Sequence, residues 1–273
     1  MKKPRVCVLR TAGTNCDRET AFAFSKVGAA AELVHINALI GRKDHLDTFQ
    51  ILALPGGFTY GDDVAAGKIL ANELRFKLSG ALKKFLRDGK LIIGICNGFQ
   101  ILVKSGLLPG NNELRQETSL IINDSGKFED RWVYLRVTGN GLRVTGTRSH
   151  VTNCVWTKDL PEIIYLPVAH GEGKFAAKDK SALERLRKNN QIIFRYCDET
   201  GFLKGYPHNP NGSLDNIAGI SDDTGRILGL MPHPERHIES YQHPRWTGLR
   251  KITKGDGLQI FSNGVEYVRK NLN

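Results

Sequence analysis

A cysteine flanked by two glycines stands where an apolar run meets a helical pattern. The run Leu91–Ile95 leads directly into Cys96, and Gly94 and Gly98 lie two residues away on either side. The same spacing produces the tight strand-to-helix turn that exposes the nucleophile of many hydrolases. At a helix N-terminus the helix dipole favours the reactive thiolate. Cys96 is therefore a candidate nucleophile, with a small buried cysteine as the alternative interpretation.

A histidine and a glutamate follow another apolar run, Ile227–Leu230, in the sequence His233-Pro-Glu235. Residues two apart in extended backbone point to the same side, so this pair can share one edge of a sheet. Histidine is the usual general base, and a carboxylate that accepts its second N–H stabilises the imidazolium. With Cys96 they fit an acyl-transfer triad, although His233 could instead cap a loop. His237 lacks a proline-fixed carboxylate and is expected at the surface.

Two glycines end a third apolar run in the sequence Pro55-Gly56-Gly57-Phe58. Glycine lets the backbone approach a ligand closely, so an exposed N–H at Gly57 could donate to a developing oxyanion. Together with the N–H of Asn97, it would form a hole with two donors. An ordinary Pro-Gly turn is the alternative.

The elements that must position these residues alternate between short β-branched runs and amphipathic segments. This rhythm predicts an α/β fold with a mostly parallel central sheet flanked by helices. A helix that contains Leu78, Leu82 and Phe85 is expected to end at Gly89 in a left-handed cap. The expected strands of the first hundred residues are Arg5–Leu9, Glu32–Ile36, Gln50–Leu54 and Leu91–Ile95.

The pattern changes between about Glu129 and Pro167, where short runs are separated by Gly, Asn and Asp. These turns predict an antiparallel elaboration of the sheet. A helix at about Lys180–Lys188 and strands at Gln191–Tyr196 and Ile227–Leu230 then return to the α/β rhythm. The last apolar residues, spaced by three and four up to Leu272, predict a closing helix. We expect one domain over residues 1–273, with a C-terminal extension from about residue 240.

Charge, cysteine content and the length of apolar runs argue against several classes of protein. The 273 residues carry a formal charge of +11, but basic and acidic side chains are interspersed, so an acidic protein or anionic solutes are expected as partners rather than nucleic acid. Five scattered cysteines without a C-x-x-C pair argue against disulfides and a metal site. No apolar run reaches the roughly 18 residues that a membrane helix needs. A soluble, cytoplasmic protein is expected.

The three motifs, in the order Pro-Gly-Gly, Gly-x-Cys-x-Gly-x-Gln and His-Pro-Glu, resemble those of the triad (class I) glutamine amidotransferases. The resemblance implies a flavodoxin-like three-layer sandwich. It also implies that Cys96 attacks the glutamine carboxamide, His233 shuttles the proton and Glu235 orients His233. Gly57 and Asn97 would hold the oxyanion. Ammonia then leaves, and water converts the thioester to glutamate.

Further segments are similar to the glutaminase subunits of phosphoribosylformylglycinamidine synthases. They include Arg10–Thr20, Phe58–Asp63 and His170-Gly-Glu-Gly-Lys-Phe175. In these subunits the glycine-rich loop lies beside the glutamine pocket. Gln100, one helical turn after Cys96, would face the same pocket, and local packing is the alternative for both. The resemblance therefore implies a second set of residues that contact the substrate: Phe58, Gln100, His170, Gly171 and Gly173.

The resemblance places the remaining chemistry on other chains. The sequence has no Gly-x-x-x-x-Gly-Lys-Ser/Thr phosphate loop, and making an amidine from an amide needs activation by phosphate. No cofactor is expected in this chain, and ATP and Mg are expected on a large synthetase subunit, with a small accessory subunit as a further candidate. The alternatives are a class I glutaminase that serves another acceptor, and a non-catalytic homologue that acts as a binding or regulatory subunit.

Overall fold

The computed structural model describes residues 2–110, 114–138, 153–248 and 254–272. In this part of the chain, nine strands form one sheet in the order β2-β1-β3-β4-β11-β10-β9-β6-β7, and two others pair as β5-β8. The strands of the large sheet are β1 (Arg5–Arg10), β2 (Ala30–His35), β3 (Ile51–Leu54), β4 (Leu91–Ile95), β6 (Glu129–Val137), β7 (Ile163–His170), β9 (Ile192–Cys197), β10 (Ile217–Ser221) and β11 (Ile227–Leu230). The small sheet contains β5 (Thr118–Ile121) and β8 (Lys174–Ala177).

One half of the large sheet is parallel. Strands β2, β1, β3, β4 and β11 all run in the same direction. Every residue of β3, β4 and β11 is buried, as expected for strands covered on both faces. The predicted mostly parallel centre is confirmed. The second strand begins and ends slightly earlier than predicted, because Ile36 already starts a helix.

The other half is antiparallel. Strands β10, β9, β6 and β7 each pair antiparallel with their neighbours, and β7 alternates between buried and partly buried residues. The predicted antiparallel elaboration is confirmed, although residues 139–152 lie outside the described residues. The expected return to the α/β rhythm is wrong for β9, which has antiparallel partners on both sides. Strand β10, whose five buried residues end with Ser221, was not predicted.

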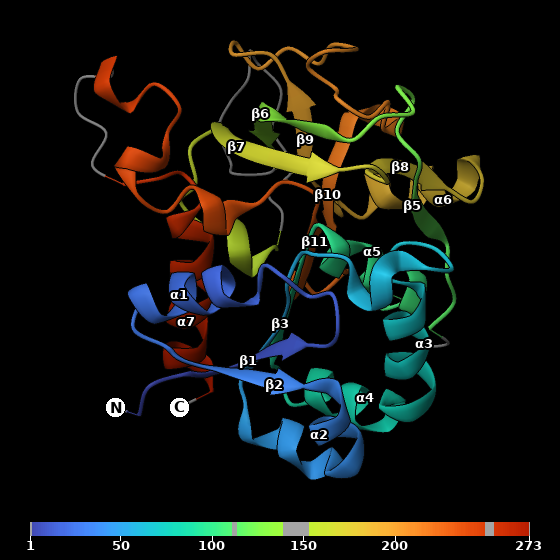
Figure 1. The fold of residues 1–273 in the computed structure, drawn as a ribbon, viewed down its shortest axis with the longest axis vertical. Helices are drawn as coiled ribbons and strands as arrows, with labels where there is room; N and C mark the ends of the chain where they lie inside the picture. The colour runs from blue at the N-terminus through green and yellow to red at the C-terminus, as the bar shows by residue number, and fades with distance from the viewer. Residues whose placement is uncertain (1, 111–113, 139–152, 249–253, 273) are drawn as a thin grey trace.

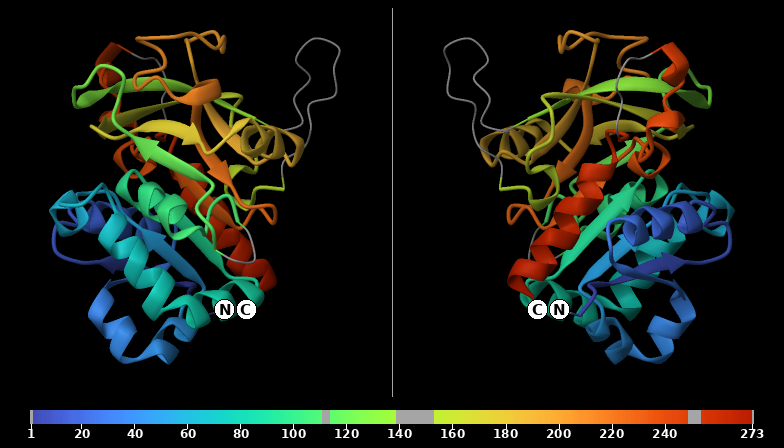
Figure 2. Two further views of the ribbon diagram at one scale, coloured as in Figure 1. Left: turned by 90° about the vertical axis from the view of Figure 1, so that its right-hand side faces the viewer. Right: turned by 90° about the vertical axis from the view of Figure 1, so that its left-hand side faces the viewer.

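Helices cover both faces of the sheet. The helices are α1 (Asp17–Lys26), α2 (Ile36–Gly41), α3 (Lys68–Lys77), α4 (Ser79–Arg87), α5 (Asn97–Ser105), α6 (Lys180–Lys188) and α7 (Leu258–Asn271). Helices α1 and α7 lie on one face of the parallel half, and α3 and α5 lie on the other (Figures 1 and 2). The chain leaves α4 through Gly89, whose φ of 77° confirms the predicted left-handed cap. Among the helices of the described residues, none combines the length and apolarity needed to cross a membrane.

The contact between α5 and β3 leaves no room for a side chain at Gly98. A Cβ atom at this position would lie 1.9 Å from the carbonyl oxygen of Leu54. Because that atom belongs to the backbone of a buried strand, a rotamer change cannot relieve the clash. The first turn of α5 therefore lies directly against the carboxyl end of β3.

We expect Gly98→Ala to lower the free energy of unfolding by about 2–4 kcal/mol, because α5 must move away from β3. Urea denaturation measures the change. Gly80→Ala in α4 is the matched control, since a Cβ there meets nothing within 4 Å. The control should be neutral or stabilise by up to about 1 kcal/mol. Equal stability of the two variants would contradict the packing argument.

Candidate active site

Cys96 occupies a strained turn between β4 and α5. Its φ and ψ are 52° and −107°, a backbone conformation that residues other than glycine rarely adopt. Its N–H donates to the carbonyl oxygen of Leu230 at 2.8 Å, at the end of β11. Its Sγ lies 3.6 Å from the carbonyl oxygen of Ala169 on β7. The turn thus holds the thiol at the edge where the parallel and antiparallel halves meet.

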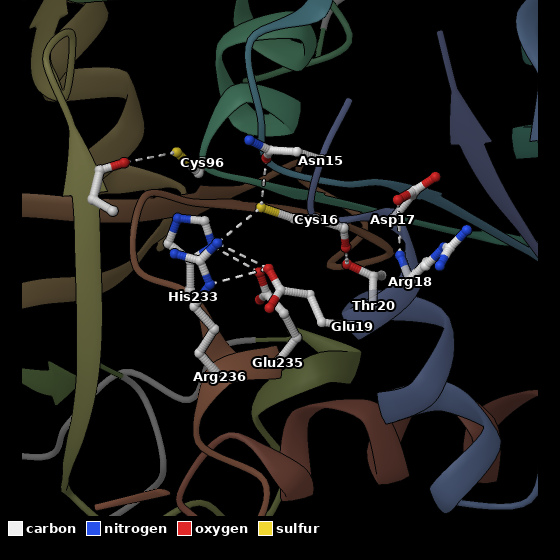
Figure 3. Close-up of polar contacts among 11 residues, drawn as sticks. Asn15, Cys16, Asp17, Arg18, Glu19, Thr20, Cys96, His233, Glu235 and Arg236 are labelled. Atoms are coloured by element: carbon white, nitrogen blue, oxygen red, sulfur yellow. Dashed lines mark hydrogen bonds and ion pairs between the residues drawn. The ribbon is translucent and has the colours of Figure 1, made fainter. Parts of the chain in front are cut away.

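His233 and Glu235 form a buried pair after β11. His233 Nδ1 donates to Glu235 Oε1 at 2.6 Å (Figure 3). Each of the two residues is 1% exposed. Proline at position 234 begins a short 3-10 turn, Pro234–Arg236, which brings the carboxylate back beneath the imidazole. The His233 N–H donates to the carbonyl oxygen of Pro167 at 2.8 Å. Backbone hydrogen bonding therefore anchors the pair to β7.

The surroundings favour a charged imidazole at His233. Burial lowers the pKa of His233, but Glu235 and the nearby Cys96 and Cys16 together outweigh that effect, so the pKa lies well above its usual value. The Nε2 atom is buried and has no hydrogen-bond partner of normal geometry among the described residues. An imidazolium here can stabilise a thiolate and can later give its proton to a leaving group.

The other four thiols lie in surroundings that oppose ionisation. Burial raises the pKa of Cys16 to about 11, although the nearby His233 and Arg236 act to lower it. Burial also raises the pKa of Cys154 and of Cys197 to about 12, and that of Cys7 further still. These four cysteines are at most 6% exposed. They are poor nucleophiles at neutral pH.

Gly56 lies against both His233 and Cys96, and its lack of a side chain leaves room for them. A Cβ atom at Gly56 would lie 2.8 Å from His233 Cε1 and 3.3 Å from Cys96 Cβ. The next residue, Gly57, has a φ of 137°, and a Cβ there would meet the backbone of Asn15 at 2.8 Å. The two glycines therefore let the end of β3 pass between the N-terminal loop and the candidate catalytic side chains.

Asn97 tethers the segment that follows Gly57. Its Oδ1 accepts hydrogen bonds from the backbone N–H and the hydroxyl of Thr59, at 3.3 and 2.8 Å. Its Nδ2 donates to Asp62 at 3.2 Å and to Gln100 Oε1 at 2.9 Å. As the first residue of α5, Asn97 has a backbone N–H without a partner inside the helix. An N–H at the start of a helix is available to an acceptor outside the helix.

Gln100 holds the glycine-rich loop that follows β7. Its Nε2 donates to the carbonyl oxygen of Glu172 at 2.7 Å, while its Oε1 accepts from Asn97. Two asparagines complete the support of this loop: Asn123 accepts from the N–H of Gly173 at 2.9 Å, and Asn211 donates to the carbonyl of Gly173 at 2.8 Å. Gly171 and Gly173 are thus held close to α5.

His170 and Phe58 have different surroundings. His170 is 3% exposed, and burial lowers its pKa to about 3, so it remains neutral. Its ring packs so tightly on Gly173 that a Cβ there would lie 2.3 Å away. Phe58 is 47% exposed, and its ring centroid lies 6.4 Å from that of Phe128. Phe128 in turn lies beside Gly171, so one ring of this exposed pair adjoins the glycine-rich loop.

A set of possible metal donors surrounds the histidine. Cys16, Glu19, His233 and Glu235 each offer one donor atom, and these atoms lie within 4.8 Å of one another. The guanidinium of Arg236, however, already donates to Cys16 and Glu19. A cation would have to displace this positive group, so the set does not fit a metal site.

Sequence reasoning missed several residues of the site. Arg236 and Glu19 carry no motif that links them, because they are 217 residues apart. Asn123 and Asn211 lie in segments that show only turn composition. His237 was wrongly expected at the surface: it is 1% exposed, and its Nδ1 donates to the carbonyl of Tyr165 at 2.7 Å. The nearby Trp132 ring covers it.

Comparisons with known proteins agree with this geometry. The profile of the CobB/CobQ-like glutamine amidotransferase domain matches residues 3–268. Phosphoribosylformylglycinamidine synthase subunit PurQ of Dehalococcoides mccartyi is 47% identical over 99% of this chain and 100% of its own length. The subunit of the same name from Methanococcus maripaludis is 42% identical over 98% of both chains.

A solved structure extends the likeness to three dimensions. A chain in the structure of PurLQS from Thermotoga maritima has a TM-score of 0.71 and 31% identity, covering 98% of this chain and 100% of that one. The strained cysteine, the buried histidine–glutamate pair and the full-length similarity agree with one another. This chain belongs to the CobB/CobQ-like glutamine amidotransferase family.

Proposed function

We propose that this chain is the glutaminase subunit of a phosphoribosylformylglycinamidine synthase. The observation that carries the proposal is the buried His233–Glu235 pair beside a cysteine held in a strained turn. The subunits named above support the choice of reaction, since they align along nearly the whole of this chain. In this role the chain hydrolyses L-glutamine and supplies ammonia for purine biosynthesis.

The proposed reaction has two stages. The Cys96 thiolate attacks the side-chain carbonyl carbon of glutamine, and His233 gives its proton to the departing nitrogen, so that ammonia leaves and a thioester remains. His233 then takes a proton from water, the resulting hydroxide attacks the thioester, and glutamate leaves as the thiol is restored. Glu235 keeps Nδ1 protonated, which directs Nε2 toward the reacting atoms.

The negative oxygen that forms at each stage needs donors. We assign this role to the backbone N–H groups of Asn97 and Gly57, since the first lies at the N-terminus of α5 and the second belongs to the glycine pair beside Cys96. The substrate-contacting group comprises Phe58, Gln100, His170, Gly171 and Gly173. Gln100 and His170 are already engaged within the protein, so we assign them to shaping the pocket.

The second half of the overall reaction belongs to other subunits. Conversion of formylglycinamide ribonucleotide to its amidine requires ATP, which we place with Mg on a large synthetase subunit. The similarity to a chain of the PurLQS structure supports an assembly of this kind, with a small accessory subunit as a further member. We place this assembly in the cytoplasm.

We expect a diazoketone analogue of glutamine to label Cys96 selectively among the five cysteines. Cys96 lies beside His233, which can exchange its proton, whereas burial raises the pKa of the other four thiols. Peptide mass spectrometry locates the label. His233→Ala is the control and should slow labelling. Modification mainly at Cys16 or Cys197 would contradict the assignment of the nucleophile.

Replacing Cys96 should separate the two half-reactions. In the assembled complex, Cys96→Ala should reduce glutamine-dependent synthesis by roughly a thousandfold or more and spare synthesis from ammonium, because the acceptor chemistry lies on another chain. Amidine formation measured with each nitrogen donor tests this. Cys154→Ala, a buried cysteine away from the site, should leave both activities intact. Loss of both activities in an intact Cys96→Ala complex would overturn the proposed division of labour.

The orienting role of Glu235 predicts that its replacement slows the reaction less than replacement of His233. Loss of the orienting carboxylate can cost up to about 10⁴ in turnover in serine enzymes, but cysteine ionises more readily and depends less on its base. Glu235→Gln should therefore reduce thioester formation less than His233→Ala, with glutamine binding largely preserved. Single-turnover kinetics and a binding measurement on both variants check this. Full turnover in Glu235→Gln would remove Glu235 from the triad.

A further inference from the structure

An ion pair lies directly behind the candidate catalytic pair. Arg236 donates from Nε and Nη2 to Glu19 Oε1, at 3.0 and 2.9 Å, and from Nη2 to Cys16 Sγ at 3.2 Å. Glu19 belongs to α1 and Cys16 immediately precedes it, whereas Arg236 ends the turn that holds Glu235. Figure 3 shows the guanidinium beside His233, turned toward Cys16 and Glu19.

The carboxylate next to Arg236 has one oxygen without a partner. Glu235 Oε1 accepts from His233, but Oε2 is buried and has no hydrogen-bond partner among the described residues. A buried carboxylate oxygen strongly favours a nearby cation. Carboxylate oxygens of Glu19 and Glu235 lie within 4.8 Å of each other, so a guanidinium bound to Glu19 is close to Glu235 as well. Arg236 therefore has two competing anionic partners.

Whether Arg236 pairs with Glu19 or with Glu235 affects the charge state of His233. A guanidinium paired with Glu235 would reduce the negative charge that stabilises the imidazolium and would draw the carboxylate away from Nδ1. Groups on three further segments also lie near His233 and influence its pKa. They are Cys96 at the strand-to-helix turn, Cys16 at the start of α1, and the neutral His170 on β7.

We propose that Glu19 and Cys16 are positioning residues for the reaction, because they hold Arg236 away from Glu235 and so reserve that carboxylate for His233. The catalytic consequence rests on the proposed glutaminase function. The arrangement itself rests on the contacts between α1 and the Pro234–Arg236 turn. The proposal predicts that replacing Glu19 lowers the His233 pKa and the rate of glutamine hydrolysis. Replacing Arg236 as well should restore both.

Glu19→Gln tests the proposal most directly. The variant keeps a hydrogen-bond acceptor but removes the charge, so Arg236 is free to pair with Glu235. With less negative charge available, the His233 pKa should fall, by on the order of one unit. Glutamine hydrolysis in the complex should fall about tenfold. Cys16→Ala removes the other restraint and should change both quantities in the same direction by a smaller amount.

The double variant Glu19→Gln with Arg236→Gln distinguishes positioning from a simple loss of packing. Without the guanidinium, Glu235 has no competing partner, so the His233 pKa and the hydrolysis rate should return toward those of the unmodified protein. A merely structural role predicts that the double variant is at least as impaired as Glu19→Gln. That result, in folded proteins, would overturn the proposal. So would an unchanged His233 titration in both Glu19→Gln and Cys16→Ala.

The titration of His233 is measured by NMR of ¹³C,¹⁵N-histidine in the free chain, and His233→Asn assigns its signal. Glu239→Gln is the matched control, because Glu239 pairs with Lys26 of α1 at 2.5 Å without belonging to the cluster around His233. It should leave the titration unchanged. The titration tests the positioning inference even if the unmodified complex does not hydrolyse glutamine. Absent hydrolysis would instead count against the proposed function.

Discussion

The strained turn at Cys96 is the constraint on which the site depends. A non-glycine residue at a φ of 52° is unfavourable by on the order of 1–3 kcal/mol, so the surrounding structure must hold it in place. That support comes from the hydrogen bond between the Cys96 N–H and Leu230, and from the close contact of Gly98 with Leu54. Three neighbouring strands, β3, β4 and β11, therefore converge on one residue. Their carboxyl ends carry the glycine pair, the cysteine and the histidine.

A second constraint is electrostatic. His233 and Glu235 are buried together, and neither charge would be tolerated there without the other. The carboxylate makes a charged imidazole favourable, and the imidazole in turn compensates for the buried carboxylate. Arg236 introduces a third charge at the edge of this pair, where Glu19 balances it. The local chemistry thus depends on charges supplied by two segments that lie at opposite ends of the chain.

The antiparallel half of the sheet completes the site from the other side. Strand β7 supplies the carbonyl oxygen near Cys96 and leads into the glycine-rich loop. Asn123 and Asn211 hydrogen-bond to that loop from segments with no regular secondary structure. Because Gln100 bonds the same loop from α5, the two halves of the sheet are connected at the candidate pocket. The antiparallel half therefore contributes one wall of the site.

The sequence by itself determined the α/β fold class, the turn at Cys96 and the histidine–glutamate pair, because each depends on local spacing. Apolar runs placed β4 and β11 at their observed bounds, and glycines at fixed offsets marked the turn. Only the tertiary structure decided which side chains surround these groups. The antiparallel pairing of β9, the burial of His237, and the Arg236–Glu19 contact all depend on long-range packing between segments that share no local pattern. Side-chain direction and charge balance at the site arise from that packing, and periodicity carries no information about them.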